Sequence, residues 1–153
     1  MSDTSEIIRL TLDYAWYLDN LDLDGVMEQF TDDAVMDATP IGLTLNVGKA
    51  DVRAFFGDVV SQLSHESHLT SNHRVDVADD AATAVGTVYY DAHAVTLEGV
   101  HARARGFYED EYRRTPSGWR ISSRVVKALT PPSMQAFSMY DSERDSDTSA
   151  RTP

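Results

Sequence analysis

The chain has 153 residues and no cysteine, and its 42% hydrophobic and 25% charged residues are typical of one globular domain without disulfides or thiolate chemistry. Its formal net charge of −12, with no basic stripe, excludes nucleic acid as a natural partner. No apolar run approaches the roughly 20 residues that span a bilayer, and the acidic segment MSDTSEIIRL lacks the apolar core of a secretory signal, so we expect a cytoplasmic protein with no membrane partner.

The first part of the sequence predicts helices. Apolar residues recur at helical spacing from Ser5 to Asp19, and a second, short helix is predicted from Leu23 to Phe30. A short strand, AVMDAT, follows, and then a loop that contains Pro40 and Gly42. The segment from Ala50 to Leu63 carries an apolar stripe and predicts an amphipathic helix.

The second part of the sequence predicts strands, because the apolar period changes to two. Four strands separated by turn-like segments are expected: Ser67–Val77, Ala81–Val95, Ala102–Arg114 and Trp119–Ala128. Helices followed by a long antiparallel sheet indicate an α+β domain over residues 1–129. Residues 130–153 open with two prolines and end in a mixed-charge, Ser/Thr-rich run, so we expect a mobile acidic tail.

Histidines supply the first candidate catalytic residues. Three of the five histidines fall within the segment HESHLTSNHRV, where strand alternation places His68 on the same polar face as Asn72. An antiparallel neighbouring strand would bring His93 near His68, and two imidazoles beside a carboxylate can transfer protons near neutral pH. A histidine in a half-exposed strand is more often a hydrogen-bonded surface residue, which is our interpretation of His65 and His73.

Asp19 and Tyr14 are the candidates on the first helix. A carboxylate at the C-terminal end of a helix is unusual, because the negative end of the helix dipole favours cations. Beside a histidine, such a carboxylate would hold the imidazole in one tautomer. The Tyr14 hydroxyl would polarise a substrate carbonyl. The plainer alternatives are a turn role for Asp19 and a core position for Tyr14.

The order of these segments resembles the nuclear-transport-factor-2-like superfamily, in its SnoaL-like branch. The likeness is carried by LDNLDLDGVMEQFTDDAVMD, SHLTSNHRVDV and GFYEDEYRRTPSGWRISSRVV, and it extends from about Ser5 to Ala128. It implies a cone of about three helices packed on a strongly curved, mixed, mostly antiparallel sheet that encloses a pocket. Function varies widely among proteins of this fold.

The site pattern is most similar to scytalone dehydratase and related small dehydratases, which carry an aspartate late in the first helix and two histidines on adjacent strands. These positions fall on Asp19, His68 and His93, and a helix tyrosine of a bile-acid dehydratase falls on Tyr14. Leu18 replaces the tyrosine that scytalone dehydratase carries before its aspartate, so the resemblance implies a different substrate. Steroid isomerases of this fold are also similar, but their general base would fall on an alanine.

The resemblance implies a cofactor-independent lyase, isomerase or cyclase that acts on a hydrophobic, carbonyl-bearing small molecule of polyketide, aromatic or terpenoid type. His68 would remove a proton alpha to the carbonyl and return one to the departing hydroxyl, with Asp19 fixing the imidazole. His93 would help to bind the leaving oxygen, and Tyr14 would donate to the carbonyl. No metal is implied. Substrate contacts are predicted for Tyr17, Phe30, Met36, Asn72, Tyr89 and Tyr108.

Two other functions stay open, namely a non-catalytic module that binds a small molecule and an accessory subunit of the same fold. In either case a homodimer is expected through the open sheet face that carries Phe107, Glu109 and Arg113. Phe137 of the predicted tail is a candidate cap for the cone.

Overall fold

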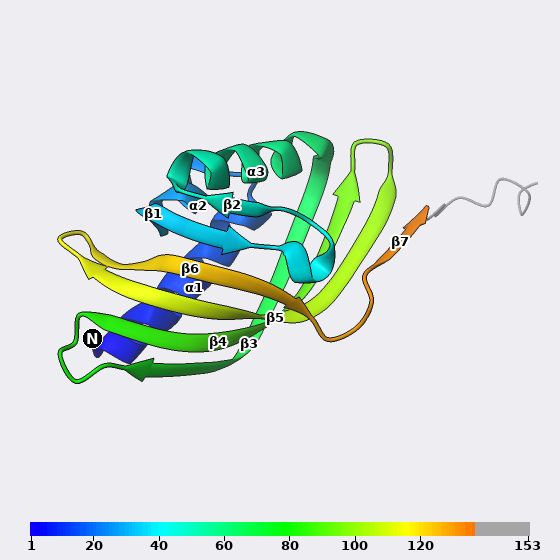
Figure 1. Ribbon diagram of the computed structural model, residues 1–153. Helices are drawn as coiled ribbons and strands as arrows, with labels where there is room; N and C mark the ends of the chain where they lie inside the picture. The colour runs from blue at the N-terminus through cyan, green and yellow to red at the C-terminus, as the bar shows by residue number, and fades with distance from the viewer. Residues whose placement is uncertain (137–153) are drawn as a thin grey trace, which may run out of the picture.

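The computed structural model describes residues 1–136, which form three α-helices, a short 3-10 turn and seven strands (Figure 1). The helices are α1 (Asp3–Asp19), α2 (Leu23–Glu28) and α3 (Lys49–Gln62), and the turn η1 is Thr39–Ile41. The strands are β1 (Phe30–Asp37), β2 (Leu45–Val47), β3 (Leu63–Val77), β4 (Thr83–Thr96), β5 (Val100–Thr115), β6 (Gly118–Ala128) and β7 (Ser133–Ala136). None of these helices is both long and apolar enough to cross a membrane.

The strands form one curved, mixed sheet in the order β2-β1-β6-β5-β4-β3, which leaves β3 at an edge. Only β1 and β6 pair in parallel among these strands, and the other neighbours are antiparallel. Figure 1 shows the sheet curving around α1, with α3 across the top of the view. The predicted α+β cone with a mostly antiparallel sheet is confirmed.

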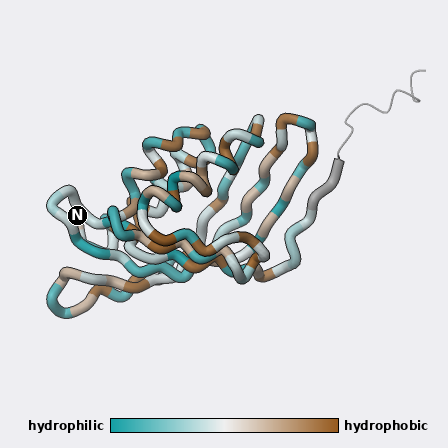
Figure 2. Tube along the Cα trace, turned by 45° about the horizontal axis from the view of Figure 1, so that its top comes forward, coloured by the Kyte–Doolittle hydropathy of each residue, from teal (hydrophilic) through white to brown (hydrophobic). Residues whose placement is uncertain are grey.

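The two faces of the sheet differ in burial. The inner face, which carries Val88, Tyr90, Tyr108 and Tyr112, packs against the helices, whereas the outer face carries Tyr89 and Phe107. Hydrophobic and hydrophilic residues are mixed along the long strands (Figure 2).

The structure differs from the predicted elements mainly in its short strands. Phe30 begins β1 instead of ending a helix, and β3 starts at Leu63, directly after α3. The strands β2 and β7 were missed, since each is too short to show an apolar alternation. β7 pairs with the first residues of β5, past the predicted domain boundary. The rest of the predicted tail, including Phe137, lies outside the described residues.

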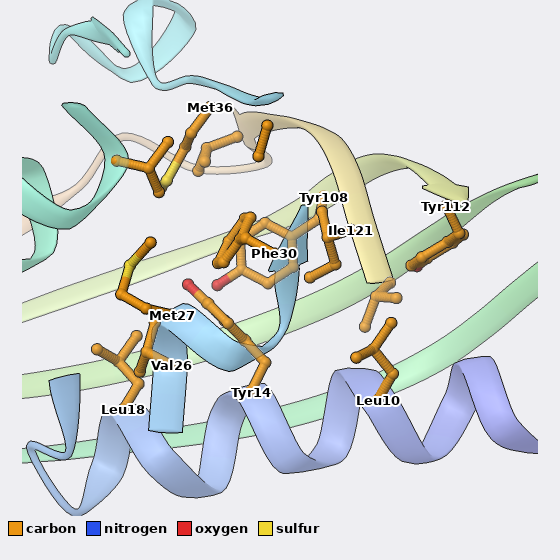
Figure 3. Packing of buried hydrophobic residues seen from close by; sticks show 14 of the residues in the cluster. Leu10, Tyr14, Leu18, Val26, Met27, Phe30, Met36, Tyr108, Tyr112 and Ile121 are labelled. Carbon is orange, nitrogen blue, oxygen red and sulfur yellow. The ribbon is translucent and has the colours of Figure 1, made fainter. Parts of the chain in front are cut away.

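Aromatic rings fill the core between the helices and the inner face. Tyr14 of α1 meets Phe30, Phe56 and Tyr108 with its ring edge to face, at centroid distances of 6.1, 6.0 and 6.0 Å. Figure 3 shows Tyr14 rising from α1 into this cluster beside Phe30 and Tyr108. Such contacts combine apolar burial with the preferred geometry of aromatic pairs.

A salt bridge is buried within the same core. Arg124 donates to both carboxylate oxygens of Asp110 at 2.8 and 2.7 Å, and the Tyr112 hydroxyl donates to Asp110 at 2.7 Å. The Arg124 and Asp110 side chains are 0% exposed. The guanidinium also lies over the rings of Tyr14 and Tyr108, 4.2 and 4.0 Å from their centroids. We call Arg124, Asp110 and Tyr112 the arginine cluster.

Candidate active site

The end of α1 meets the edge strand β3 at Asp19 and His68. Oδ1 of Asp19 lies 2.8 Å from Nδ1 of the His68 ring, and Oδ2 accepts the His68 backbone N–H at 3.0 Å. A carboxylate only accepts hydrogen bonds, so Nδ1 carries a hydrogen and Nε2 points away from Asp19. The His68 side chain is 5% exposed and that of Asp19 27%. The carboxylate therefore fixes both the position and the tautomer of the ring.

Asn20, and not Asp19, caps the end of α1. The Asn20 side-chain amide donates to the Trp16 carbonyl at 2.7 Å, and the following residue, Leu21, adopts a left-handed φ of 55°. These groups terminate the helix, and the Asn20 side chain adds a second hydrogen bond to a carbonyl that already accepts the Asn20 backbone N–H. The Asp19 carboxylate is left available to reach β3, which contradicts the alternative of a turn role for this residue.

Glu66 is a third member of the site that the sequence analysis overlooked. It precedes His68 by two residues on β3, so both side chains point to the inner face. Glu66 Oε1 lies 3.8 Å from His68 Nε2, and the Glu66 side chain is 9% exposed. The inward position of Glu66 could have been predicted from the sequence, because strand alternation places Glu66 on the same face as His68. We call Asp19, His68 and Glu66 the histidine cluster.

The electrostatic surroundings of Glu66 favour its neutral form. Burial raises the pKa of the Glu66 carboxyl from an ordinary 4.5 to about 7, with His68 opposing the shift and Asp19 adding to it. Its Oε2 atom is buried and has no hydrogen-bond partner among the described residues. Glu66 therefore titrates near neutral pH, in the range in which proton transfer to and from a histidine is most effective.

Tyr14 lies in the core, which confirms the plainer of its two interpretations. Its side chain is buried, and burial raises the pKa of its hydroxyl to about 12, with Arg124 lowering and Glu66 raising it. At neutral pH the hydroxyl therefore keeps its proton and can act as a hydrogen-bond donor. A contact of this hydroxyl with a substrate carbonyl stays a prediction.

His93 does not lie near His68, so the predicted pairing of the two imidazoles is wrong. Ala92 is the residue opposite His68, and His93 faces Ser67, which places its side chain on the outer face. There its ring stacks on His101 at 5.0 Å, with Nε2 2.9 Å from Nδ1 of His101. A register offset of one residue moves a side chain to the opposite face of a sheet.

A β-bulge around Asn72 explains a second error. Asn72 has a left-handed φ of 52°, and the extra residue reverses which side chains point inward. His68 points inward before the bulge. After it His73 does so, with Nδ1 3.2 Å from the Thr11 hydroxyl. Asn72 itself is exposed, so the inward position predicted for it is wrong.

The other predicted substrate contacts divide between the two faces. Phe30, Met36 and Tyr108 are buried inside the cone, and Tyr17 is half-buried against the core. Tyr89 is on the outer face, 37% exposed and stacked on Phe107 at 5.8 Å, so its predicted inward position is wrong. The pairing of Tyr89 with Ser71 explains this, because inward and outward side chains alternate along β4.

Small side chains cover the inner face beside the histidine cluster. Ala92 and Ala94 pair with His68 and Glu66 on β4, and Ala104 of β5 pairs with Ala92. All three alanines are only half-buried, so solvent reaches this part of the sheet. Between α1 and the edge strand β3, a groove of about 450 Å³ is lined by Asp19 and His68, among others. Asp19 and His68 thus border a groove, whereas the side chains of the Arg124–Asp110 ion pair are fully buried.

No group of three or more histidine, aspartate or glutamate side chains within residues 1–136 is placed to hold a metal ion.

The curved mixed sheet and the three helices packed against it define the nuclear-transport-factor-2-like cone fold. Residues 1–125 match the model of the SnoaL-like domain, and the chain belongs to this family.

Three comparisons illustrate this relationship. A solved structure from Novosphingobium aromaticivorans, provisionally named an aromatic ring hydroxylase, is 35% identical, with a TM-score of 0.82 over 87% of this chain and 93% of its own. An uncharacterized protein of Mycobacterium tuberculosis is 28% identical over 131 residues, which cover 82% of this chain and 84% of the relative. A second Novosphingobium aromaticivorans structure, provisionally named a scytalone dehydratase, has a TM-score of 0.76 and 17% identity, covering 92% and 94% of the two chains. This last likeness is one of fold alone.

Proposed function

We propose that Asp19 and His68 are the acid–base pair of a lyase, isomerase or cyclase that acts on a hydrophobic, carbonyl-bearing small molecule without a cofactor. The SnoaL-like family includes dehydratases, isomerases and cyclases. The proposal rests on the two hydrogen bonds that the Asp19 carboxylate accepts from His68, one from the ring and one from the backbone N–H. A histidine held in this way by a carboxylate is a common arrangement for general acid–base catalysis.

In the proposed mechanism, His68 Nε2 removes a proton alpha to the substrate carbonyl. The Asp19 carboxylate, which accepts from Nδ1, stabilises the imidazolium that this step creates. The protonated Tyr14 hydroxyl donates to the carbonyl oxygen, where negative charge develops. The departing group then leaves from the neighbouring carbon in a dehydration, or a proton returns at another carbon in an isomerisation.

The surroundings of the pair support an apolar substrate of polyketide, aromatic or terpenoid type. Ala92 and Ala104 present small apolar side chains beside His68. Phe55 of α3 and Ile41 of η1 are half-buried hydrophobic residues that pack against the same core. An aromatic or alicyclic ring would lie against such a surface, because burying apolar area contributes about 25 cal/mol per Å².

Substitution of the pair tests the proposal. His68→Ala and Asp19→Asn should each lower turnover of aromatic β-hydroxy ketones by roughly 10²–10⁴-fold, with folding intact. The double variant should be little worse than either single variant, because the two residues act as one unit. His65→Ala, which changes an exposed histidine on the same strand, is the matched control.

Turnover is followed by mass spectrometry, which also separates the alternatives. Dehydration removes one water from the substrate, whereas the hydroxylase name of the 35% identical relative would require a product that gains an oxygen atom. Wild-type rates in both variants would contradict the acid–base assignment. A wild type that binds the ketones and converts none of them would identify a binding module or accessory subunit.

We also propose that a second copy of the chain covers the outer face. Phe107 lies there beside Tyr89, and Val85 on the same face is 54% exposed. Glu109 and Arg113 carry ion pairs with Lys127 and Asp33. Val85→Glu should convert a dimer to a monomer in sedimentation at micromolar concentration. A monomeric wild type under these conditions would rule out this assembly.

A further inference from the structure

The Glu66 carboxyl is buried but incompletely hydrogen-bonded. One of its oxygens is buried without a hydrogen-bond partner among the described residues, and the other lies 3.8 Å from His68 Nε2. A buried polar atom without a partner costs free energy. An alanine would fit a purely structural role better than a carboxylic acid with an unpaired oxygen.

We propose that Glu66 is a catalytic residue, the acid that protonates the leaving oxygen while His68 accepts the carbon proton. The inference rests on the proposed function and deepens it, since it assigns the two proton transfers to two groups instead of one. It also supplies the group at the leaving oxygen that was expected at His93, which lies on the other face of the sheet.

The side chains around Glu66 suit this role. Two titratable groups shift the pKa of Glu66, namely His68 on the same strand and Asp19 on α1. Glu66 in turn raises the pKa of Tyr14 on α1. Burial and the Asp19 carboxylate both favour the neutral acid, and the raised pKa of about 7 keeps a large fraction protonated at neutral pH. A neutral carboxylic acid presents one O–H donor, which an ionised glutamate lacks.

The proton balance closes for the dehydration of a β-hydroxy ketone. His68 Nε2 takes the proton alpha to the carbonyl, and the electron pair of that C–H bond forms the new C=C bond. The neighbouring C–O bond breaks, and its oxygen leaves as water with the proton from Glu66. The products are an enone and water, and the enzyme is left with an imidazolium and a carboxylate. Transfer of the proton from His68 to Glu66 across their short gap restores both groups.

The nature of the leaving group separates the two proton transfers experimentally. The probes are a phenyl-substituted β-hydroxy ketone, whose hydroxyl needs a proton to leave, and its O-acetyl ester, whose acetate leaves as a stable anion. Glu66→Gln should lower turnover of the hydroxy ketone by roughly 10²–10⁴-fold and leave that of the ester near the wild-type rate. His68→Ala should lower both, and Glu98→Gln, an exposed control, should lower neither.

The outcomes separate the donor role of Glu66 from the acid–base role of Asp19 and His68. Equal loss on both probes in Glu66→Gln, with His68→Ala also impaired, overturns the donor role and leaves the proposed function standing. A wild type that converts neither probe overturns the proposed function and the donor role with it. Selective loss on the hydroxy ketone supports both.

A titration tests the inference without any substrate. In protein carrying ¹³C-labelled glutamate, one side-chain carboxyl signal should titrate near pH 7, disappear in Glu66→Gln and persist in Glu98→Gln. Asp19→Asn should lower the pKa of Glu66, because it removes a like charge, and His68→Gln should raise it. The absence of any glutamate titrating above about pH 6 would overturn the donor role, since a carboxylate at neutral pH has no proton to give.

Discussion

The arginine cluster and the histidine cluster both place charged groups on the inner face of one sheet, and they differ in how completely those groups are paired. Each oxygen of Asp110 accepts hydrogen bonds within the arginine cluster, and the side chains of the ion pair are 0% exposed. Nη1 of Arg124 is the only polar atom there without a partner among the described residues, and aromatic rings cover the guanidinium. Glu66 in the histidine cluster keeps an unpaired oxygen and lies beside half-buried alanines.

The difference separates a fully buried ion pair from a carboxyl that is available for the proposed chemistry. A buried ion pair with its hydrogen bonds made has no proton to exchange and fixes the surrounding packing, although it adds little net stability. A carboxyl that is buried but incompletely paired has its pKa moved toward neutrality and stays chemically available. The histidine cluster, to which we assign the proposed chemistry, lies where the strands carry alanine, and the arginine cluster lies where they carry tyrosine.

The largest effect is expected from breaking the arginine cluster. Asp110→Asn leaves the Arg124 charge buried without compensation, which should lower the free energy of unfolding by about 3–5 kcal/mol. Urea denaturation measures this loss. Glu109→Gln removes a half-exposed partner of Lys127 on the outer face and should cost under about 1 kcal/mol. Equal costs for the two substitutions would show that burial does not separate these carboxylates.

Glu66→Gln should raise the free energy of unfolding above neutral pH, whereas Asp110→Asn lowers it. The folded protein raises the pKa of Glu66 from 4.5 to about 7, so the fold favours the neutral acid. That stability is fully present below about pH 4.5 and is lost as the pH rises through 7, which at about 1.4 kcal/mol per pKa unit amounts to roughly 3 kcal/mol. The glutamine variant does not ionise, so it should be more stable than the wild type at about pH 8–9 by a similar amount.

Thermal unfolding of both proteins across this pH range checks the sign. Parallel pH profiles for wild type and Glu66→Gln would contradict a buried, neutral glutamic acid.

A small effect on stability is expected from Tyr14→Phe, because the Tyr14 side chain lies against Arg124 and its hydroxyl is influenced by Glu66. The phenyl ring keeps its contacts with Phe30, Phe56 and Arg124, so unfolding should change by only about 1 kcal/mol. Turnover should fall by roughly 10²-fold or more if the hydroxyl donates to the substrate carbonyl. Unchanged kinetics would restrict Tyr14 to its core role.

The helices and the long strands follow from local sequence patterns, and the Asp19–His68 contact follows from the resemblance to the small dehydratases. Prediction from the sequence failed where the outcome depends on strand register. His93 and Tyr89 were expected inside the cone, but pairing offsets of one residue place them outside. Asn72 was expected inside because alternation was extended through a bulge that only the backbone reveals.

Glu66 is a different case, since its position followed from the alternation already used for His68. Its importance depends on burial, on the nearby Asp19 and on an unpaired oxygen, and none of these is visible in the letters HESH. Whether a glutamate is an ordinary surface charge or a neutral acid is decided by tertiary packing and not by its sequence neighbours.

The hydrogen bond from the His68 backbone to Asp19 also has a consequence for aggregation. β3 is an edge strand, and free N–H groups along such an edge invite pairing with a strand from another molecule. Asp19 occupies one of these groups in the middle of the edge and presents a carboxylate there. A foreign strand that extends the sheet at this point must first displace Asp19. Asp19 thus both orients His68 for the proposed chemistry and blocks a free N–H group of the edge strand. Its substitution should remove the orientation of the ring and leave this N–H group open to pairing.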